Sequence, residues 1–89
     1  MFSITRCKGF HIKFENGWTI SVQFGQYNYS SNYNLDAESQ DDPVPPSDTA
    51  EIAAFNEADD WYVFPDGNTV QGYQTPKQVL EVMNLVAAL

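Results

Sequence analysis

Residues 9–25, GFHIKFENGWTISVQFG, contain two short runs in which apolar and polar side chains alternate. The apolar positions are Phe10, Ile12 and Phe14 in the first run and Trp18, Ile20, Val22 and Phe24 in the second. A period of two is typical of strands that bury one face, so this segment predicts a hairpin. A two-residue turn would place the two apolar sets on opposite faces. A three-residue turn from Glu15 to Gly17, with Gly17 in the left-handed conformation, pairs Phe14 with Trp18 and keeps both sets together.

The C-terminal half predicts a second group of strands. Alternation over residues 52–55 and an apolar run over residues 61–64 indicate two strands joined by a loop at 56–60. Residues 65–67, Pro-Asp-Gly, match a type I turn followed by a glycine bulge, and they lead into a short strand at 68–73. Together these segments predict a three-stranded antiparallel meander.

The chain then carries the start signal of a helix. Thr75 can cap it, Pro76 suits its first position, and Gln78 completes a capping box. The apolar stripe that follows consists of Val79, Val82, Met83, Val86 and Leu89, widened by Leu80 and Leu85. The prediction for the whole chain is therefore an α+β fold: an antiparallel sheet of about five strands, built from a hairpin and a three-stranded meander, with the C-terminal helix packed on one face.

Length and cysteine content place this chain in a broad class. With 89 residues it is expected to form a single domain, residues 1–89, around one core. The single Cys7 excludes an internal disulfide framework. The sequence has no secretory signal pattern and no apolar run of about 18 residues. We therefore expect a cytoplasmic protein.

A long connection at residues 26–49 separates the two groups of strands. Its first half, QYNYSSNYNL, is rich in tyrosine and has enough aromatic surface to pack on the body of the domain. Its second half, DAESQDDPVPPSD, is acidic and proline-rich, a composition typical of solvated, extended segments. Connections of this length in small domains are either functional or disordered. We expect the first half to be ordered and the second half to be mobile.

Charge is distributed unevenly along the chain. Twelve acidic and four basic residues give a formal net charge of −8. Ten of the acids lie between residues 36 and 66 without any lysine or arginine: Asp36, Glu38, Asp41, Asp42, Asp48, Glu51, Glu57, Asp59, Asp60 and Asp66. Nucleic acids and anionic membranes both bind clustered cations, so the sequence argues against either as a direct partner.

No residue pattern predicts catalysis, a metal or a cofactor. Cys7 and His11 are separated by about 13 Å on an extended strand, which is too far for a nucleophile and its base. The sequence has no second histidine or cysteine with which to complete a zinc site. The acidic runs lack the spacing of a calcium loop, and solvation explains them better. The glycines match turns and strand ends rather than a phosphate-binding loop. We therefore expect no enzymatic activity.

The predicted meander has a second apolar face. One face, turned to the helix, is expected to hold Ile52, Ala54, Tyr62, Phe64 and Val70, and the other is expected to hold Ala53, Phe55, Trp61 and Val63. An apolar face of this kind needs a cover. Three covers are open: the tyrosine-rich loop, a second copy of this chain in a homodimer, and a foreign protein.

The hairpin sequence, together with NYSSNYNL, TAEIAAF and WYVFPDGNTVQGY, resembles a group of small accessory proteins encoded by tailed bacteriophages. The resemblance spans most of the chain. It implies an accessory protein made in the cytosol of an infected bacterium, and it assigns no activity to particular residues.

Two functions are compatible with these observations. The first is an interaction protein that binds and inhibits a host defence or nucleic-acid-processing protein with a basic surface, its acids imitating the charge of a nucleic acid. The expected binding residues are Tyr27, Tyr29, Tyr33, Asp36, Asp41, Asp42, Asp59, Asp60 and Trp61. The alternative is a module in which the tyrosine-rich loop binds a small molecule, for example a nucleotide signal.

Overall fold

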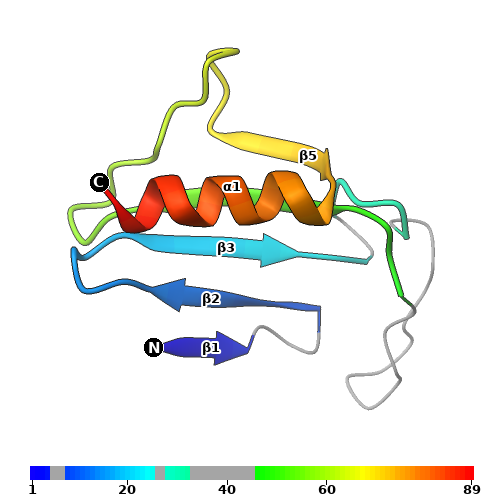
Figure 1. Ribbon diagram of the computed structural model, residues 1–89, viewed down its shortest axis with the longest axis horizontal. Helices are drawn as coiled ribbons and strands as arrows, with labels where there is room; N and C mark the ends of the chain where they lie inside the picture. Colours follow the sequence, from blue (N-terminus) through cyan, green and yellow to red (C-terminus); the bar gives the residue numbers. More distant parts are fainter. Residues whose placement is uncertain (5–7, 26–27, 33–45) are drawn as a thin grey trace.

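The computed structural model describes residues 1–4, 8–25, 28–32 and 46–89 (Figure 1). Within them, five antiparallel strands form one sheet in chain order, and one helix packs on one face of it. The elements are β1 (Phe2–Ile4), β2 (Gly9–Lys13), β3 (Thr19–Gln23), β4 (Ala50–Phe55), β5 (Val70–Gln74) and α1 (Pro76–Ala87). The predicted α+β class, with an antiparallel sheet and a C-terminal helix, is confirmed.

The N-terminal hairpin has the predicted register. Ile12 pairs with Ile20, and Phe10 pairs with Val22. The backbone N–H of Phe14 donates to the carbonyl of Trp18 at 2.8 Å, and Gly17 has a φ of 86°. The parity of the apolar side chains therefore selects the three-residue turn, because only this turn buries both strands on the same face.

The predicted meander differs from the observed one in its middle strand. Residues 61–64 form no strand within the described chain beyond a single bridge between Phe55 and Trp61. β5 occupies the edge of β4, with Ala53 paired to Val70, so residues 61–64 leave the sheet after the N–H of Tyr62 donates to Ala54. Val70 was predicted on the helix-covered face, but its pairing with Ala53 places it on the opposite face.

The sheet reaches five strands because β1 joins it at the other edge. Phe2 pairs with Ile12, and Ile4 pairs with Phe10. A three-residue strand is too short to show a reliable period of two, so nothing in the sequence predicted it. Its position is determined by the free hydrogen-bonding edge of β2.

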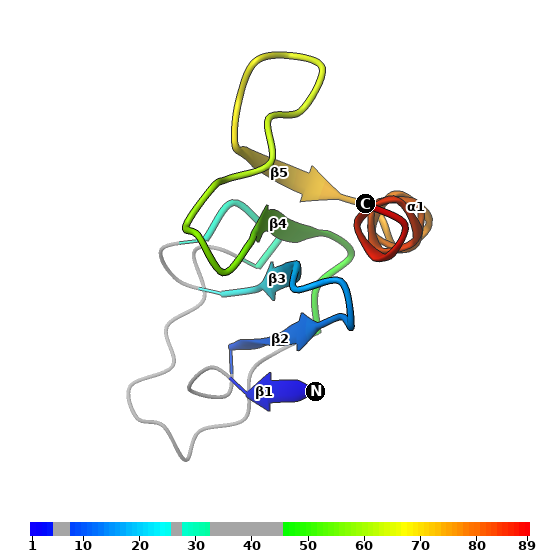
Figure 2. The same cartoon turned by 90° about the vertical axis from the view of Figure 1, so that its left-hand side faces the viewer.

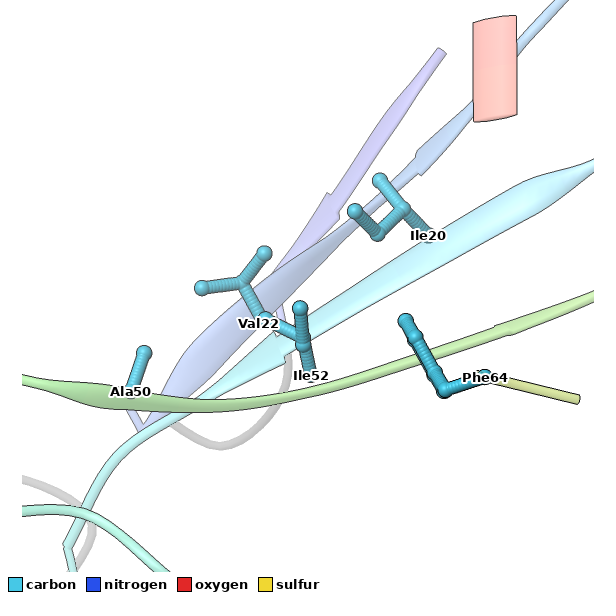
Figure 3. Close-up of a cluster of buried hydrophobic side chains, with 5 residues drawn as sticks. All are labelled: Ile20, Val22, Ala50, Ile52 and Phe64. Carbon is cyan, nitrogen blue, oxygen red and sulfur yellow. The ribbon is translucent and has the colours of Figure 1, made fainter. Parts of the chain in front are cut away.

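The core lies between the sheet and α1. Its buried side chains come from β3, β4 and the segment before β5, and they point to one side of the sheet (Figure 3): Ile20, Val22, Ala50, Ile52 and Phe64. Val86 of α1 is fully buried against this side, whereas Leu80, Leu85 and Leu89 are exposed. The stripe on α1 is therefore narrower than predicted.

Both ends of α1 are capped by side chains. At its start, the hydroxyl of Thr75 accepts from the N–H of Gln78 at 3.3 Å, and the N–H of Thr75 donates to the side chain of Gln78, as predicted. At its end, the amide of Asn16 donates to the carbonyls of Val86 at 2.9 Å and Leu89 at 3.0 Å, with a longer contact of 3.3 Å to Ala87. The turn of the hairpin thus caps a helix that is 70 residues further along the chain.

Three turns in the structure share one hydrogen-bonding pattern. In each, three residues separate a pair of backbone groups that hydrogen-bond, and the third residue has a positive φ. Gly17 and Gly67 take this position at 86°, and Asp59 takes it at 62° in the turn between Asn56 and Asp60. A non-glycine residue in this conformation is strained, although aspartate tolerates it better than most.

The strain at Asp59 gives a testable expectation. Asp59→Gly should raise the free energy of unfolding by about 0.5 kcal/mol, because relief of the left-handed conformation exceeds the extra entropy of the unfolded glycine. Ala58→Gly, one residue earlier, should lower it by about 0.5–1 kcal/mol, because Ala58 does not need a positive φ. Urea unfolding of both variants measures the difference, and equal effects would contradict the shared turn geometry.

Candidate interaction surface

The structure describes four of the nine residues predicted to bind a partner. Tyr29, Asp59, Asp60 and Trp61 are all exposed. The remaining five lie outside the described residues: Tyr27, Tyr33, Asp36, Asp41 and Asp42. Tyr29 and Trp61 lie on the sheet face opposite α1, one near each end of β4, and Asp59 and Asp60 are in the turn directly before Trp61. The separation of Tyr29 and Trp61 along β4 is about 13 Å, given the rise per residue of a strand.

Residues 56–69 project from the sheet between β4 and β5, and we call them the acidic arm (Figures 1 and 2). Over residues 61–64 its side chains alternate between solvent and core. Tyr62 and Phe64 pack against the core, with their rings 5.0 Å apart, and the ring of Trp18 lies 6.5 Å from that of Tyr62. Trp61 is 50% exposed and Val63 is 59% exposed. Because Tyr62 and Phe64 pack inward, the apolar side chains of Trp61 and Val63 point into solvent.

The carboxylates of the acidic arm differ in their hydrogen bonds and ion pairs. Lys13 lies 2.6 Å from Glu57, and its hydrogen bond and charge lower the pKa of Glu57 below the ordinary value of 4.5. Hydrogen bonds from Gln71 and then from Asn68 lower the pKa of Asp66 below its ordinary 3.8. Among the described residues, the structure gives the carboxylate of Asp59 no ion-pair or hydrogen-bond partner.

The turn that carries Asp59 and Asp60 is organised by Asn56. The side-chain oxygen of Asn56 accepts from the N–H of Ala58 at 2.9 Å and from the N–H of Asp60 at 3.0 Å. Its amide donates to the carboxylate of Asp60 at 3.3 Å. This one side chain therefore holds the backbone of the turn before Trp61 and binds the carboxylate of Asp60 directly.

An aromatic row continues from the arm across the sheet. The rings of Phe55 and Trp61 are 5.2 Å apart, and the ring of His11 lies edge-on to Phe55 at 5.7 Å. His11 is on β2 and Phe55 is on β4, so the contact crosses β3, where the neighbouring side chains on this face, Thr19 and Ser21, are small. From the sequence, no role beyond solvation was expected for His11, and its contact with Phe55 depends on these small residues.

The other end of the same face is covered by residues 28–32. The N–H of Tyr29 donates to Glu51 at 2.6 Å, and the N–H of Tyr73 donates to the carbonyl of Tyr29 at 2.8 Å. The two tyrosine rings lie 6.4 Å apart. A Cβ added to Gly72 would come within 2.6 Å of the Cβ of Tyr29, so glycine at this position permits the close approach. From the sequence, glycines such as Gly72 were expected only to serve turns and strand ends.

Buried polar groups fix the position of residues 28–32. Ser30 and Asn32 are buried, and both accept from the N–H of Gly25, at 3.1 and 2.8 Å. The hydroxyl of Ser31 lies 2.6 Å from that of Thr49, just before β4. The prediction that the first half of the connection packs on the domain is confirmed for these residues. Its acidic, proline-rich half lies mostly outside the described residues.

Among the residues that the structure describes, the second sheet face is covered at one end only. Residues 28–32 cover the end near Glu51 and Gly72. The arm end, with Trp61 and Val63, is exposed. The described part of the loop therefore accounts for one part of the cover that the sequence predicts, and a second copy or a foreign protein remains a proposal for the rest.

The described residues contain no group of three or more histidine, cysteine, aspartate or glutamate side chains placed to hold a metal ion. Cys7, the other half of the pair with His11, lies outside them. Over the same residues, no helix combines the length and hydrophobicity needed to cross a membrane. In comparisons with known proteins, no family model, curated protein or solved structure matches this chain.

Proposed function

We propose that this protein binds another protein through the acidic arm and the adjoining aromatic row, and that it performs no chemistry of its own. The observation that carries the proposal is the exposure of Trp61 and Val63 on a segment anchored by Tyr62 and Phe64. Tryptophan is among the side chains most enriched at interface hot spots, the few residues that contribute most of the binding free energy. Anchoring in the core also lowers the entropy lost on binding.

The charge around Trp61 supports a partner with a basic surface. Asp59 and Asp60 directly precede it, and the chain as a whole carries a formal charge of −8. Such a surface attracts cationic sites and accelerates association. The resemblance to phage accessory proteins supports a host defence or nucleic-acid-processing protein as the target. Carboxylates at its phosphate-binding site would then inhibit it by replacing nucleic-acid charge.

The proposal is tested on a partner captured from bacterial lysate, by measuring association and dissociation rates at several salt concentrations. Replacing Asp59 and Asp60 with asparagine should slow association and flatten its salt dependence, because steering depends on charge. Trp61→Ala should speed dissociation by about tenfold or more. Replacing Asp59 and Asp60 with asparagine should leave the melting temperature nearly unchanged, since both side chains are exposed. Trp61→Ala also removes the ring contact with Phe55, so its melting temperature should fall, and circular dichroism is used to verify that the variant is folded at the temperature of the rate measurements.

Matched controls lie on the outer side of α1. Glu81→Gln removes one exposed acid, and Leu85→Ala removes one exposed apolar side chain, both away from the arm. Neither should change the two rates. Association and dissociation rates that stay the same in the acidic-arm variants would contradict the proposal. Turnover of a substrate by the purified protein would contradict it as well. Salt-insensitive binding of a small molecule at Tyr29 would instead support the alternative function.

A further inference from the structure

The turn between β2 and β3 contains a chemically labile pair of residues. The sequence has seven asparagines, and only Asn16 is followed by a glycine, Gly17. Asparagine is a thermolabile residue. A following glycine makes it more labile, because a residue without a Cβ leaves its backbone nitrogen open to the preceding side chain. Asn16 is exposed, so water can reach it. This pair is therefore the position of the chain most prone to deamidation.

Two separate structural requirements place this pair in the turn. Position 17 favours glycine, because its φ is 86°. Position 16 needs a side chain that both accepts and donates. The side-chain oxygen of Asn16 accepts from the N–H of Trp18 at 3.0 Å, and its amide donates to the end of α1. A carboxylate could accept but not donate. The fold thus depends on a pair of residues that is chemically unstable.

Deamidation would remove the group that caps α1. The backbone nitrogen of Gly17 attacks the Cγ atom of Asn16, so a new N–Cγ bond forms and the bond from Cγ to Nδ2 breaks. The proton of the Gly17 N–H ends on the leaving nitrogen, which departs as ammonia. Water then opens the cyclic succinimide at one of its two carbonyls and gives aspartate or isoaspartate. Water is the one co-reactant, so the chain can modify itself without a partner.

In the folded chain, hydrogen bonds occupy both of the reacting groups. The leaving nitrogen Nδ2 donates to the carbonyls of Val86 at 2.9 Å and Leu89 at 3.0 Å. The N–H of Gly17 donates to the carbonyl of Phe14 at 3.1 Å. These bonds must break before Gly17 can lose its proton and Nδ2 can leave. Figures 1 and 2 show the turn beside the C-terminal end of α1, so the helix itself holds the leaving group.

The charges around the turn would not replace the lost cap. A carboxylate at position 16 would lie at the negative end of the α1 dipole. Among the cations that the structure describes, Lys13 is already in an ion pair, and the Met1 ammonium donates to the carbonyl of Lys13 at 3.0 Å. Lys8 precedes β2 and Lys77 is in the first turn of α1, so each is at the opposite end of its element from the turn.

We propose that Asn16 is a self-modification site protected by α1, and that its deamidation permanently removes the cap from the end of this helix. The bonds from Asn16 to α1 exist only while the last turn of the helix is in place, so the reaction proceeds during brief local openings of that turn. The product cannot restore the cap, because a carboxylate has no proton to donate to Val86 and Leu89. The reaction does not depend on the proposed function.

Mass spectrometry of proteolytic peptides measures the reaction in the full chain, incubated at one neutral pH and one temperature with and without urea. In urea, Asn16 should lose its amide faster than Asn68, which is followed by threonine and is the internal reference. Without urea, the loss at Asn16 should be at least about tenfold slower, because several hydrogen bonds must first break. The proposal is overturned if Asn16 reacts no faster than Asn68 in urea, or equally fast in both conditions.

Two glycine substitutions test whether the last turn of α1 gives the protection. Ala87→Gly weakens that turn, whereas Lys77→Gly weakens the first turn of the same helix, and both residues are exposed. Circular dichroism is used to verify that both variants are folded. Ala87→Gly should raise the deamidation rate at Asn16 by about three- to fivefold, in line with the low helix propensity of glycine. Lys77→Gly should leave the rate near that of the parent, and equal rates in the two variants would overturn the proposal.

The consequence for the fold is measured on the modified chain itself. Ion exchange separates it from the parent, because deamidation adds a negative charge. The deamidated chain should melt at a lower temperature than the unmodified chain, because it has lost the donor at the end of α1. Equal melting temperatures would show that the modification removes no cap, which also overturns the proposal.

Discussion

Phe64→Ala is expected to lower the free energy of unfolding by about 3–5 kcal/mol, the usual cost of removing a buried phenylalanine side chain. Phe64 is 7% exposed, lies outside any strand and belongs to the buried cluster with Ile20, Val22, Ala50 and Ile52. Phe64 is also the last residue of the acidic arm that packs in the core. Its loss should therefore free the arm as well as open a cavity.

The neighbouring residue is the matched control for this prediction. Val63→Ala should change the free energy of unfolding by no more than about 0.5 kcal/mol, because Val63 is 59% exposed. Phe64→Leu should cost less than Phe64→Ala, because leucine fills part of the volume. Urea unfolding of the three variants gives the comparison. Similar losses at positions 63 and 64 would show that the arm does not alternate between core and solvent.

Asn16→Asp is expected to cost about 1–2 kcal/mol at neutral pH, although it changes only one side-chain group. The amide donates to the carbonyls that end α1, and a carboxylate has no proton to donate. Its negative charge also lies at the negative end of the helix dipole. The acceptor bond from the N–H of Trp18 would survive, so the turn itself should persist.

This cost should depend on pH in a definite direction. The carbonyl oxygens disfavour the charged form of the introduced carboxyl, so they raise its pKa above the unfolded value of about 3.9. Because the pKa is raised in the folded state, the free energy of unfolding of the variant falls below that of the parent only when the carboxyl ionises. The variant should approach the parent at about pH 3 and lose stability as the pH rises through the unfolded and then the folded pKa.

Asn84→Asp controls for charge alone, because it places the same new charge on α1 without contacts to its terminal carbonyls. It should cost only about a few tenths of a kcal/mol. Thermal unfolding of both variants at pH 3 and pH 7 separates the two effects. Equal losses for the two variants at pH 7 would mean that Asn16 is not a helix cap in solution.

The candidate site was only partly predictable. Trp61, Asp59 and Asp60 are exposed and adjacent, as composition suggested, because acids and an interface-type aromatic follow each other directly in the chain. The contact between His11 and Phe55 was not predicted, since it needs two non-adjacent strands to meet over the small residues of β3. The proximity of Tyr29 to Gly72 likewise depends on a loop that folds back onto a strand distant in the sequence.

Sequence alone determined those features that depend on residues a few positions apart. The hairpin register follows from parity between Phe14 and Trp18, and the start of α1 follows from Thr75 and Gln78, because each signal acts through backbone groups within one turn. Only the tertiary structure decided which segments share the sheet. Residues 61–64 and β5 both could pair with β4, and β5 occupies that edge while Phe64 enters the core. The physical reason is that hydrogen-bonding edges and buried volume are shared by distant parts of the chain, so the outcome depends on all of them at once.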